Sequence, residues 1–172
     1  MAIMVDRMIR AAKLDAQLYE EVEADKGALG QAMAVVVLSS IAGGIGSGGL
    51  GGLTGFFIGT VGALIGWFIW AALTYFIGTR LLPEPTTRAD VGELLRTTGF
   101  SSSPGLIRVL GLIPGITEIV FLVSGVWMLT AMIIAVRQAL DYRSTFRAVG
   151  VCVIGWVVQM VVILLLMGFI RS

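Results

Sequence analysis

Long apolar segments separated by short polar connections dominate the pattern of this chain. A helix that crosses a bilayer needs about 20 mostly apolar residues. Five segments suit that role: Ala28–Gly46, Leu53–Ile77, Phe100–Gly115, Ile116–Val136 and Val149–Ile170. The pattern therefore predicts an all-α fold, a polytopic membrane helical bundle with five transmembrane helices.

The first residues follow a different pattern, in which apolar side chains recur at helical spacing among charged ones. The apolar stripe consists of Met4, Met8, Ala11, Leu18 and Val22. Such a helix suits the membrane interface, with its stripe facing lipid or the transmembrane helices. Asp15 is placed to cap a second short helix over Ala16–Asp25. We divide the chain into an interfacial amphipathic lead-in, residues 1–27, and a transmembrane domain, residues 28–172.

The third apolar segment is the shortest. From Phe100 to Gly115 it has 16 residues, about 24 Å of α-helix, less than the ~30 Å thickness of the hydrocarbon core. A re-entrant loop is therefore the alternative, but it places the Arg137–Arg147 connection on the membrane side opposite the other arginines. We expect a short full crossing that ends in a turn at Pro114 and Gly115.

The basic residues are distributed unevenly over the two sides of this arrangement. If five segments cross alternately, the N-terminal region, the Arg80–Arg96 connection and the Arg137–Arg147 connection share a face. That face holds all but two of the 12 Lys and Arg residues, the exceptions being Arg108 and Arg171. Such an excess marks the cytoplasmic side of a membrane. The N-terminus is expected in the cytoplasm and the C-terminus outside.

Composition agrees with a membrane protein and excludes several functions. The chain is 57% hydrophobic and 13% charged, with mean hydropathy +0.95, whereas soluble domains carry about 25% charged residues. No basic face with stacking aromatic groups suggests a nucleic-acid partner. There is no His and a single Cys, Cys152, so we expect no metal site, no cofactor and no enzymatic activity.

The turn between the first two apolar segments, Gly46–Gly52, contains the spacing G-x-G-x-x-G. In a dinucleotide site this motif follows a strand and is followed by an acidic residue that binds the ribose. Here apolar helices flank it, and the nearest downstream acid is Glu84. We interpret it as a plain glycine turn.

Small residues recur every three or four positions in the first two spans, a spacing that lets membrane helices approach closely. In the second span these are Gly55, Gly59, Gly62 and Gly66, and in the first they include Ser39, Gly43, Ser40 and Gly44. The two helices are expected to pack tightly, either on each other or across an oligomer.

Two charged residues and two glutamines fall within the apolar segments. Arg108 lies in the third segment and Glu118 just beyond its turn, so the two can meet near the outer surface as an ion pair; the alternative is that they line a transport path or bind a partner. Gln31 and Gln159 suit hydrogen bonds between helices.

The connection before the last span carries a candidate site for a partner or a lipid headgroup. Its members are Arg137, Gln138, Asp141, Tyr142, Arg143 and Arg147. Asp141 can pair with Arg137 four residues earlier, and Arg143 and Arg147 can hold lipid phosphates. The alternative is a cap that sets the topology of the two helices it joins.

Several runs together carry a family resemblance. They are Tyr19–Asp25, Arg96–Pro104, Trp127–Leu129, Ala135–Tyr142, Ser144-Thr145 and Arg147–Val149. With these runs the chain resembles the Yip1-domain family of membrane proteins. The resemblance covers essentially the whole chain in order. It implies a five-helix integral membrane protein with a cytoplasmic N-terminus, in agreement with the charge pattern.

The resemblance also bears on partners and location. Eukaryotic members of the family associate with Rab-type small GTPases and with one another in Golgi and ER traffic. This chain has a much shorter N-terminal region, which argues against a GTPase partner. A short version of this kind resembles prokaryotic members, so we expect a multi-pass protein of the cell (inner) membrane.

Two functions follow from these expectations. The first is a non-enzymatic protein that acts by association, as a homo-oligomer, as an organiser of membrane, or by recruiting another protein at its cytoplasmic face. The alternative is a small transporter, channel or lipid-moving protein in which Arg108 and Glu118 line a path.

Overall fold

The structure is a computed structural model that describes residues 2–49 and 52–171. Within these residues all regular secondary structure is helical, which confirms the all-α class. The α-helices are α1 (Ala2–Ala12), α2 (Ala16–Ala24), α3 (Leu29–Gly46), α4 (Gly52–Phe76), α5 (Val91–Phe100), α6 (Thr117–Ala139) and α7 (Thr145–Arg171). Two 3₁₀-helices, η1 (Lys26–Ala28) and η3 (Ser103–Leu112), and a π-helix, η2 (Ile77–Leu81), complete the chain.

Four stretches of the described chain are long and apolar enough to cross a membrane. They are Lys26–Gly46, Thr54–Leu81, Thr117–Ala139 and Thr145–Val162. Each overlaps a predicted span, although the last begins four residues before the expected Val149. Large apolar side chains on α4, α6 and α7 are exposed, among them Ile58, Leu122 and Trp156. In a membrane protein, lipid covers such a surface.

The third predicted span differs from expectation. Instead of one α-helix from Phe100 to Gly115, α5 ends at Phe100 and the 3₁₀-helix η3 begins at Ser103, with Pro104 in its first turn. Proline has no backbone N–H and its ring clashes with the preceding turn of a continuous α-helix. The segment therefore begins earlier, at Val91, and proceeds in two helical pieces.

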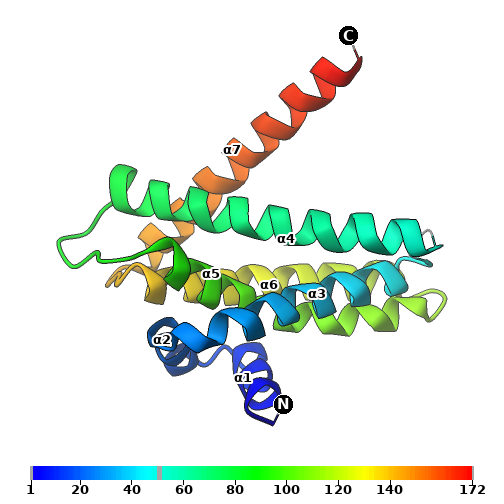
Figure 1. The fold of residues 1–172 in the computed structure, drawn as a ribbon, viewed down its shortest axis with the longest axis horizontal. Helices are drawn as coiled ribbons and strands as arrows, with labels where there is room; N and C mark the ends of the chain where they lie inside the picture. The colour runs from blue at the N-terminus through cyan, green and yellow to red at the C-terminus, as the bar shows by residue number, and fades with distance from the viewer. Residues whose placement is uncertain (1, 50–51, 172) are drawn as a thin grey trace.

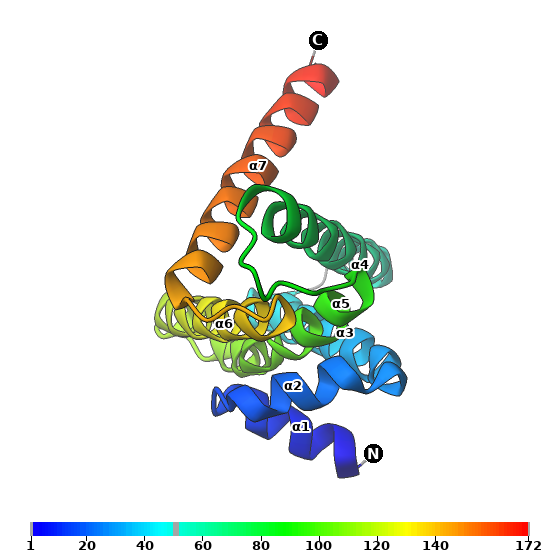
Figure 2. The same ribbon diagram turned by 90° about the vertical axis from the view of Figure 1, so that its left-hand side faces the viewer.

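The helices of the bundle run in alternating directions (Figure 1). Helix α3 and the α5–η3 segment run one way, and α4 and α6 run the other. Figures 1 and 2 both show α7 starting beside α4 and α6 and then leaving the bundle at an angle. The connections after η2 and after α6 therefore lie at one end, and the glycine turn after α3 and the turn before α6 lie at the other.

Close backbone approach joins α3 to the α5–η3 segment. A Cβ built on Gly46 of α3 lies 1.8 Å from the carbonyl oxygen of Arg108, and a Cβ on Gly99 lies 2.7 Å from the Cβ of Ala32. A Cβ on Gly105 lies 2.1 Å from Ser39 Oγ. We call these contacts the α3 seam. The small residues of the first span thus pack against the third segment.

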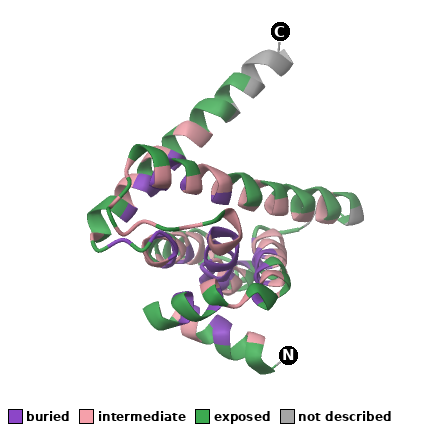
Figure 3. Cartoon of the chain, turned by 60° about the vertical axis from the view of Figure 1, so that its left-hand side comes forward, coloured by how far each residue is buried: buried purple, intermediate pink, exposed green. Residues whose placement is uncertain are grey.

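The amphipathic lead-in is folded onto the bundle. Asp15 caps α2 as predicted, its carboxylate accepting a hydrogen bond from Gln17 N at 3.0 Å. Met8, Ala11, Leu18 and Val22 are buried, so the apolar stripe faces the helices of the bundle and not lipid (Figure 3). Trp127 of α6 fixes the end of α1 by donating to Ala12 O at 2.7 Å.

Ion pairs hold α1 against α2 and the residues that flank it, and a hydrogen bond joins α1 to α3. Arg7, which is buried, pairs with Asp25 at 2.9 Å and donates to Gln31 of α3 at 3.2 Å. Gln31 therefore makes the predicted hydrogen bond between helices. Arg10 pairs with Glu21 at 2.7 Å and with Asp15 at 2.8 Å. The hydrogen bond from Arg10 lowers the pKa of Glu21 below its ordinary value.

The glycine turn after α3 contains backbone that favours glycine. Gly48 and Gly49 have φ of +95° and +145°, a region that residues with a Cβ rarely adopt. Residues 50 and 51 of this turn lie outside the described chain.

Candidate functional site

The segments that sequence analysis placed on one face meet at one end of the bundle. Helix α2, the connection from η2 to α5 and the connection from α6 to α7 lie there together, as the contacts below show. We call it the basic end, because it contains the arginines of both connections. The six residues of the predicted partner or headgroup site all lie there.

Tyr142 is the centre of this region. Its side chain is buried, and its hydroxyl lies 2.9 Å from Gly78 O and 2.7 Å from Leu82 O. Burial raises its pKa to about 12, so the hydroxyl keeps its proton and acts as a donor. The π-helix that follows α4 offers these carbonyl groups, since Leu82 comes directly after it. Tyr142 therefore ties the end of α4 to the turn that follows α6.

One residue of that turn has a left-handed backbone conformation. Asp141 adopts φ of +52°, which Asp tolerates better than most residues with a Cβ. Its carbonyl accepts a hydrogen bond from Thr86 Oγ1 at 2.9 Å, and its side chain is exposed. Arg137 donates to Tyr142 O at 3.3 Å. The predicted pairing of Asp141 with Arg137 was wrong, because the left-handed turn ends α6 before the helical spacing of four residues can bring the two side chains together.

Glu84 was missed by sequence analysis, although it joins the two connections of the basic end. Its side chain is only 8% exposed. It accepts hydrogen bonds from the backbone of Arg143 at 3.0 Å and of Ser144 at 3.3 Å, just before α7 begins. It also pairs with Arg147 at 3.4 Å. A lone acid between two prolines gave no signal, since its partners lie about 60 residues later in the sequence.

Helix α2 closes the same end. Gln138 donates to Glu20 at 2.6 Å. Arg96 is buried and donates to the carbonyl of Val22 at 3.0 Å and to that of Glu23. The residues of the candidate site are therefore largely engaged in holding the fold together, which agrees with the alternative of a topology-setting cap. The side chains of Arg143 and Asp141 stay exposed.

Arg108 and Glu118, the predicted pair, do not meet in the structure. Arg108 donates through Nε to Ser124 Oγ at 3.0 Å, and its guanidinium lies 5.6 Å from the ring centre of Phe121. Glu118 is exposed in the first turn of α6, and no ion pair is described for it within residues 2–49 and 52–171. Because η3 is a 3₁₀-helix, the expected α-helical spacing between the two residues does not apply.

The glycines of α4 have a surface of their own. A Cβ built on Gly59, Gly62 or Gly66 meets no atom within 4 Å. Gly59 O accepts a hydrogen bond from Ser40 Oγ of α3 at 3.4 Å. Gly66 also lines the interior cavity described below, so we give the name α4 glycine face to the surface of Gly59 and Gly62 alone.

The family model described as the Yip1 domain matches residues 16–167. This range includes every run that carried the resemblance and all of the basic end. The chain belongs to the Yip1 domain family. No curated protein and no solved structure matches the chain significantly.

Membership fits the architecture described above. The matched range begins at the first residue of α2 and extends into α7, so the family domain includes α2 together with the apolar helices. The contacts of Gln138 with Glu20 and of Arg96 with Val22 thus lie within the Yip1 domain. The protein is an integral membrane protein of this family.

Proposed function

We propose that this Yip1-domain protein is non-enzymatic and acts by association within the membrane, most directly with a second copy of itself through the α4 glycine face. The family is known as one of non-enzymatic membrane proteins. The exposed apolar surface of α4, α6 and α7 supports insertion in lipid. The remaining question is which surface of the inserted protein meets another protein.

Five crossings fit the lengths of the helices. Helix α5 supplies about 15 Å, and the ten residues of η3 supply about 20 Å because a 3₁₀-helix rises about 2.0 Å per residue. Together they can reach across a core of ~30 Å. An excess of arginine at the basic end supports a cytoplasmic basic end, with the N-terminus on that side.

Two exposed groups support contact of the basic end with the membrane interface. Helix α1 presents Ile3, Val5 and Ile9 away from the bundle, as an interfacial helix does. Phe146, at the start of α7, is 89% exposed and follows closely on Arg143. An aromatic ring beside a basic group suits the headgroup region.

The α4 glycine face carries the proposal. Gly62 forms the floor of a groove of about 420 Å³ whose walls are Phe57, Ile58, Val61 and Ile65. Small residues with bulky neighbours let membrane helices approach until their backbones are in contact. Two copies of α4 that cross at Gly62 can each place Ile58 or Ile65 in the groove of the other. Such a contact is two-fold symmetric and closes on itself.

Disulfide crosslinking tests this proposal. In a background with Cys152→Ser, we expect Gly62→Cys to form a crosslinked dimer in native membranes. Leu122→Cys is the matched control, since Leu122 is 69% exposed on α6, and it should stay monomeric. Gly62→Leu should reduce the assembly seen by native mass spectrometry. A protein that stays monomeric with Cys at position 62, or an assembly unchanged by Gly62→Leu, contradicts the proposal.

The alternative of a transport path lined by Arg108 and Glu118 has weaker support, because Glu118 is exposed and only Arg108 faces the interior of the bundle. Flux and lipid-scrambling assays in liposomes test it. A flux that Arg108→Ala leaves unchanged counts against this path.

A further inference from the structure

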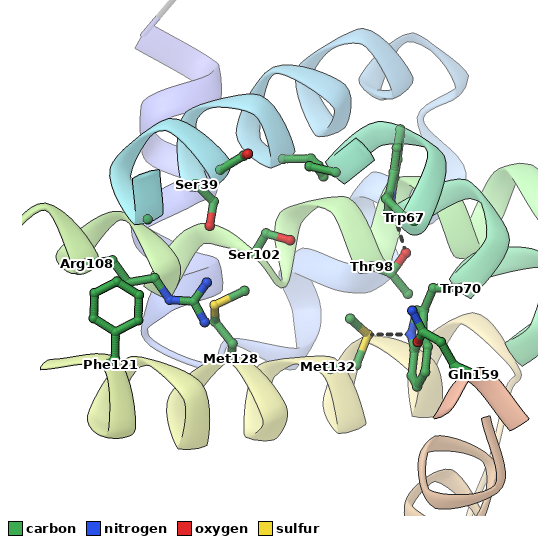
Figure 4. A pocket seen from close by; sticks show the side chains of 15 residues that line it. Ser39, Trp67, Trp70, Thr98, Ser102, Arg108, Phe121, Met128, Met132 and Gln159 are labelled. Carbon is green, nitrogen blue, oxygen red and sulfur yellow. Dashed lines mark hydrogen bonds between the residues drawn. The ribbon is translucent and has the colours of Figure 1, made fainter. Parts of the chain in front are cut away.

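A cavity of about 490 Å³ lies within the bundle, lined by residues of α3, α4, α5, η3, α6 and α7 and of the bend before η3 (Figure 4). Its polar lining residues are Ser39, Ser40, Thr98, Ser102, Arg108 and Gln159. Most of the remaining wall is apolar or aromatic. Its volume falls within the range of about 300–1,000 Å³ that is usual for ligand sites.

Arg108 is the one charged residue among those that line this cavity. In Figure 4 its side chain extends into the cavity and its guanidinium lies beside Met128. The hydrogen bond to Ser124 and the ring of Phe121 fix the Nε side of the guanidinium. Gly43 of α3 packs beside this side chain, since a Cβ there would lie 3.6 Å from Arg108 Cδ, an ordinary van der Waals distance. The group is held in place, but its two terminal nitrogens have no hydrogen-bond acceptor within the described chain.

No acidic residue lines the cavity, and no ion pair of Arg108 occurs among the described residues. A cation at membrane depth costs several kcal/mol unless it pairs or reaches water. Elsewhere in this chain the buried arginines have oxygen partners: Arg7 has carboxylates and Arg96 has backbone carbonyls. Arg108 differs because none of the ion pairs among the described residues gives it a counter-charge.

We infer that the cavity binds the phosphate of an anionic phospholipid, with Arg108 as the residue that recognises it. The planar guanidinium presents two parallel N–H donors that match a phosphate. Ser39 and Ser102 lie in the same half of the cavity as Arg108 (Figure 4), and no hydrogen bond is described for either hydroxyl. They supply further donors to the same phosphate.

The other half of the cavity favours a lipid over a free ion. Trp67 and Trp70 line it from α4, and Met132 lines it from α6. Their polar atoms are engaged: Trp67 Nε1 donates to Thr98 Oγ1 at 3.2 Å, and Trp70 Nε1 lies 3.2 Å from Met132 Sδ. An apolar wall of this kind suits the glycerol and upper acyl carbons that adjoin a lipid phosphate. Neutral headgroups with a cationic amine are disfavoured beside an unpaired arginine.

Native mass spectrometry of the full chain in mild detergent tests the inference, with phosphatidylglycerol, phosphatidylcholine or inorganic phosphate added as probe. We expect wild type to retain phosphatidylglycerol in preference to phosphatidylcholine. Arg108→Gln, which removes the charge but keeps most of the length, should weaken phosphatidylglycerol binding about tenfold or more. Arg143→Gln is the matched control, because Arg143 is an exposed arginine at the basic end, and it should leave the binding unchanged.

Three results overturn the inference: equal binding of phosphatidylglycerol by wild type and Arg108→Gln, equal binding of the two lipids by wild type, or retention of inorganic phosphate but not of lipid. If Arg108→Gln does not fold, Ala63→Phe decides. Ala63 lines the cavity from α4, so the larger side chain occupies the cavity while Arg108 remains, and loss of phosphatidylglycerol is again expected. Neither variant changes a residue that lines the groove around Gly62, so crosslinking through position 62 remains an independent measurement.

Discussion

The α3 seam and the α4 glycine face both consist of glycines and other small residues on apolar helices, but the first is tightly packed and the second is open. In the α3 seam, a side chain on Gly46 or Gly105 would overlap neighbouring atoms. On the α4 glycine face, a side chain on Gly59 or Gly62 would meet nothing. Both surfaces lie on apolar helices of membrane-spanning length, yet 33% of the α3 span and only 6% of the α4 span is buried inside the protein.

The difference shows that small-residue spacing predicts close packing but does not identify the partner. The partner of α3 is the α5–η3 segment, whose own glycines at positions 99, 105 and 111 match those of α3. Helix α4 contacts α3 through Gly59 and lines the interior cavity through Gly66, but no described atom lies within 4 Å of a Cβ on Gly62. Gly62 therefore remains open to contact with another molecule.

The largest effect is expected from Gly46→Ala. The new Cβ would lie 1.8 Å from a backbone oxygen, which cannot move without displacing η3, so we expect the free energy of unfolding to fall by about 3 kcal/mol or more. Unfolding in detergent measures this. Gly30→Ala is the matched control on the same helix, because its Cβ meets no atom within 4 Å. Similar losses for both variants contradict the α3 seam.

Tyr142→Phe should have the next largest effect. This variant tests whether the basic end holds the end of α4. The variant leaves the carbonyls of Gly78 and Leu82 without their shared donor. We expect a loss of about 1–2 kcal/mol in the free energy of unfolding. Tyr75→Phe, at a half-buried tyrosine for whose hydroxyl no hydrogen bond is described, should change it by less than about 0.5 kcal/mol. Equal effects of the two variants indicate that α4 is held elsewhere.

Sequence reasoning succeeded where local chemistry or average hydrophobicity decides the structure. Four apolar spans, the cap at Asp15 and the gathering of basic connections follow from such signals. It failed for the third segment, because Pro104 and the glycines of the α3 seam favour a 3₁₀-helix that hydropathy does not register. Because the third segment was expected to be one α-helix, Arg108 was wrongly expected to meet Glu118, and it binds Ser124 instead.

The candidate site was located correctly along the chain, but its contacts could not be predicted. Arg137, Tyr142 and Arg147 do lie at one end of the bundle. Their partners are mostly backbone carbonyls and the single carboxylate of Glu84. Every residue has a backbone carbonyl, so the sequence does not indicate which carbonyl accepts a hydrogen bond. Only the folded structure shows that these side chains already have partners. Whether Arg143 or another exposed group there binds a partner stays a prediction.

A third prediction concerns the pH dependence of stability. It acts through Glu23 of α2, a helix that packs against α5 of the α3 seam. The Oε2 atom of Glu23 is buried and has no hydrogen-bond partner within the described chain. Burial, and then the charges of Glu20, Glu93 and Asp141, raise its pKa from 4.5 to about 8 against the attraction of Arg96. The folded protein therefore binds a proton that the unfolded chain releases.

The sign of the pH effect follows from that proton. The contribution of Glu23 to stability is complete below about pH 4.5 and is lost as pH rises through about 8. We expect a decrease of about 1 kcal/mol over this window, since partial exposure screens the charge. Glu23→Gln should remove the decrease. Denaturation in detergent at several pH values measures it, and an identical pH profile in the variant assigns the dependence to another group.

The smallest effect is expected from Gly62→Ala, which places a methyl group on the α4 glycine face. Because nothing lies within 4 Å of this Cβ and alanine favours helix over glycine by roughly 0.5–1 kcal/mol, the monomer should be unchanged or slightly more stable. Unfolding at protein concentrations low enough to keep the chain monomeric in detergent measures this. A loss comparable to that of Gly46→Ala would show that the α4 glycine face is covered within a single chain. A neutral result leaves the face open, as association with a second copy requires.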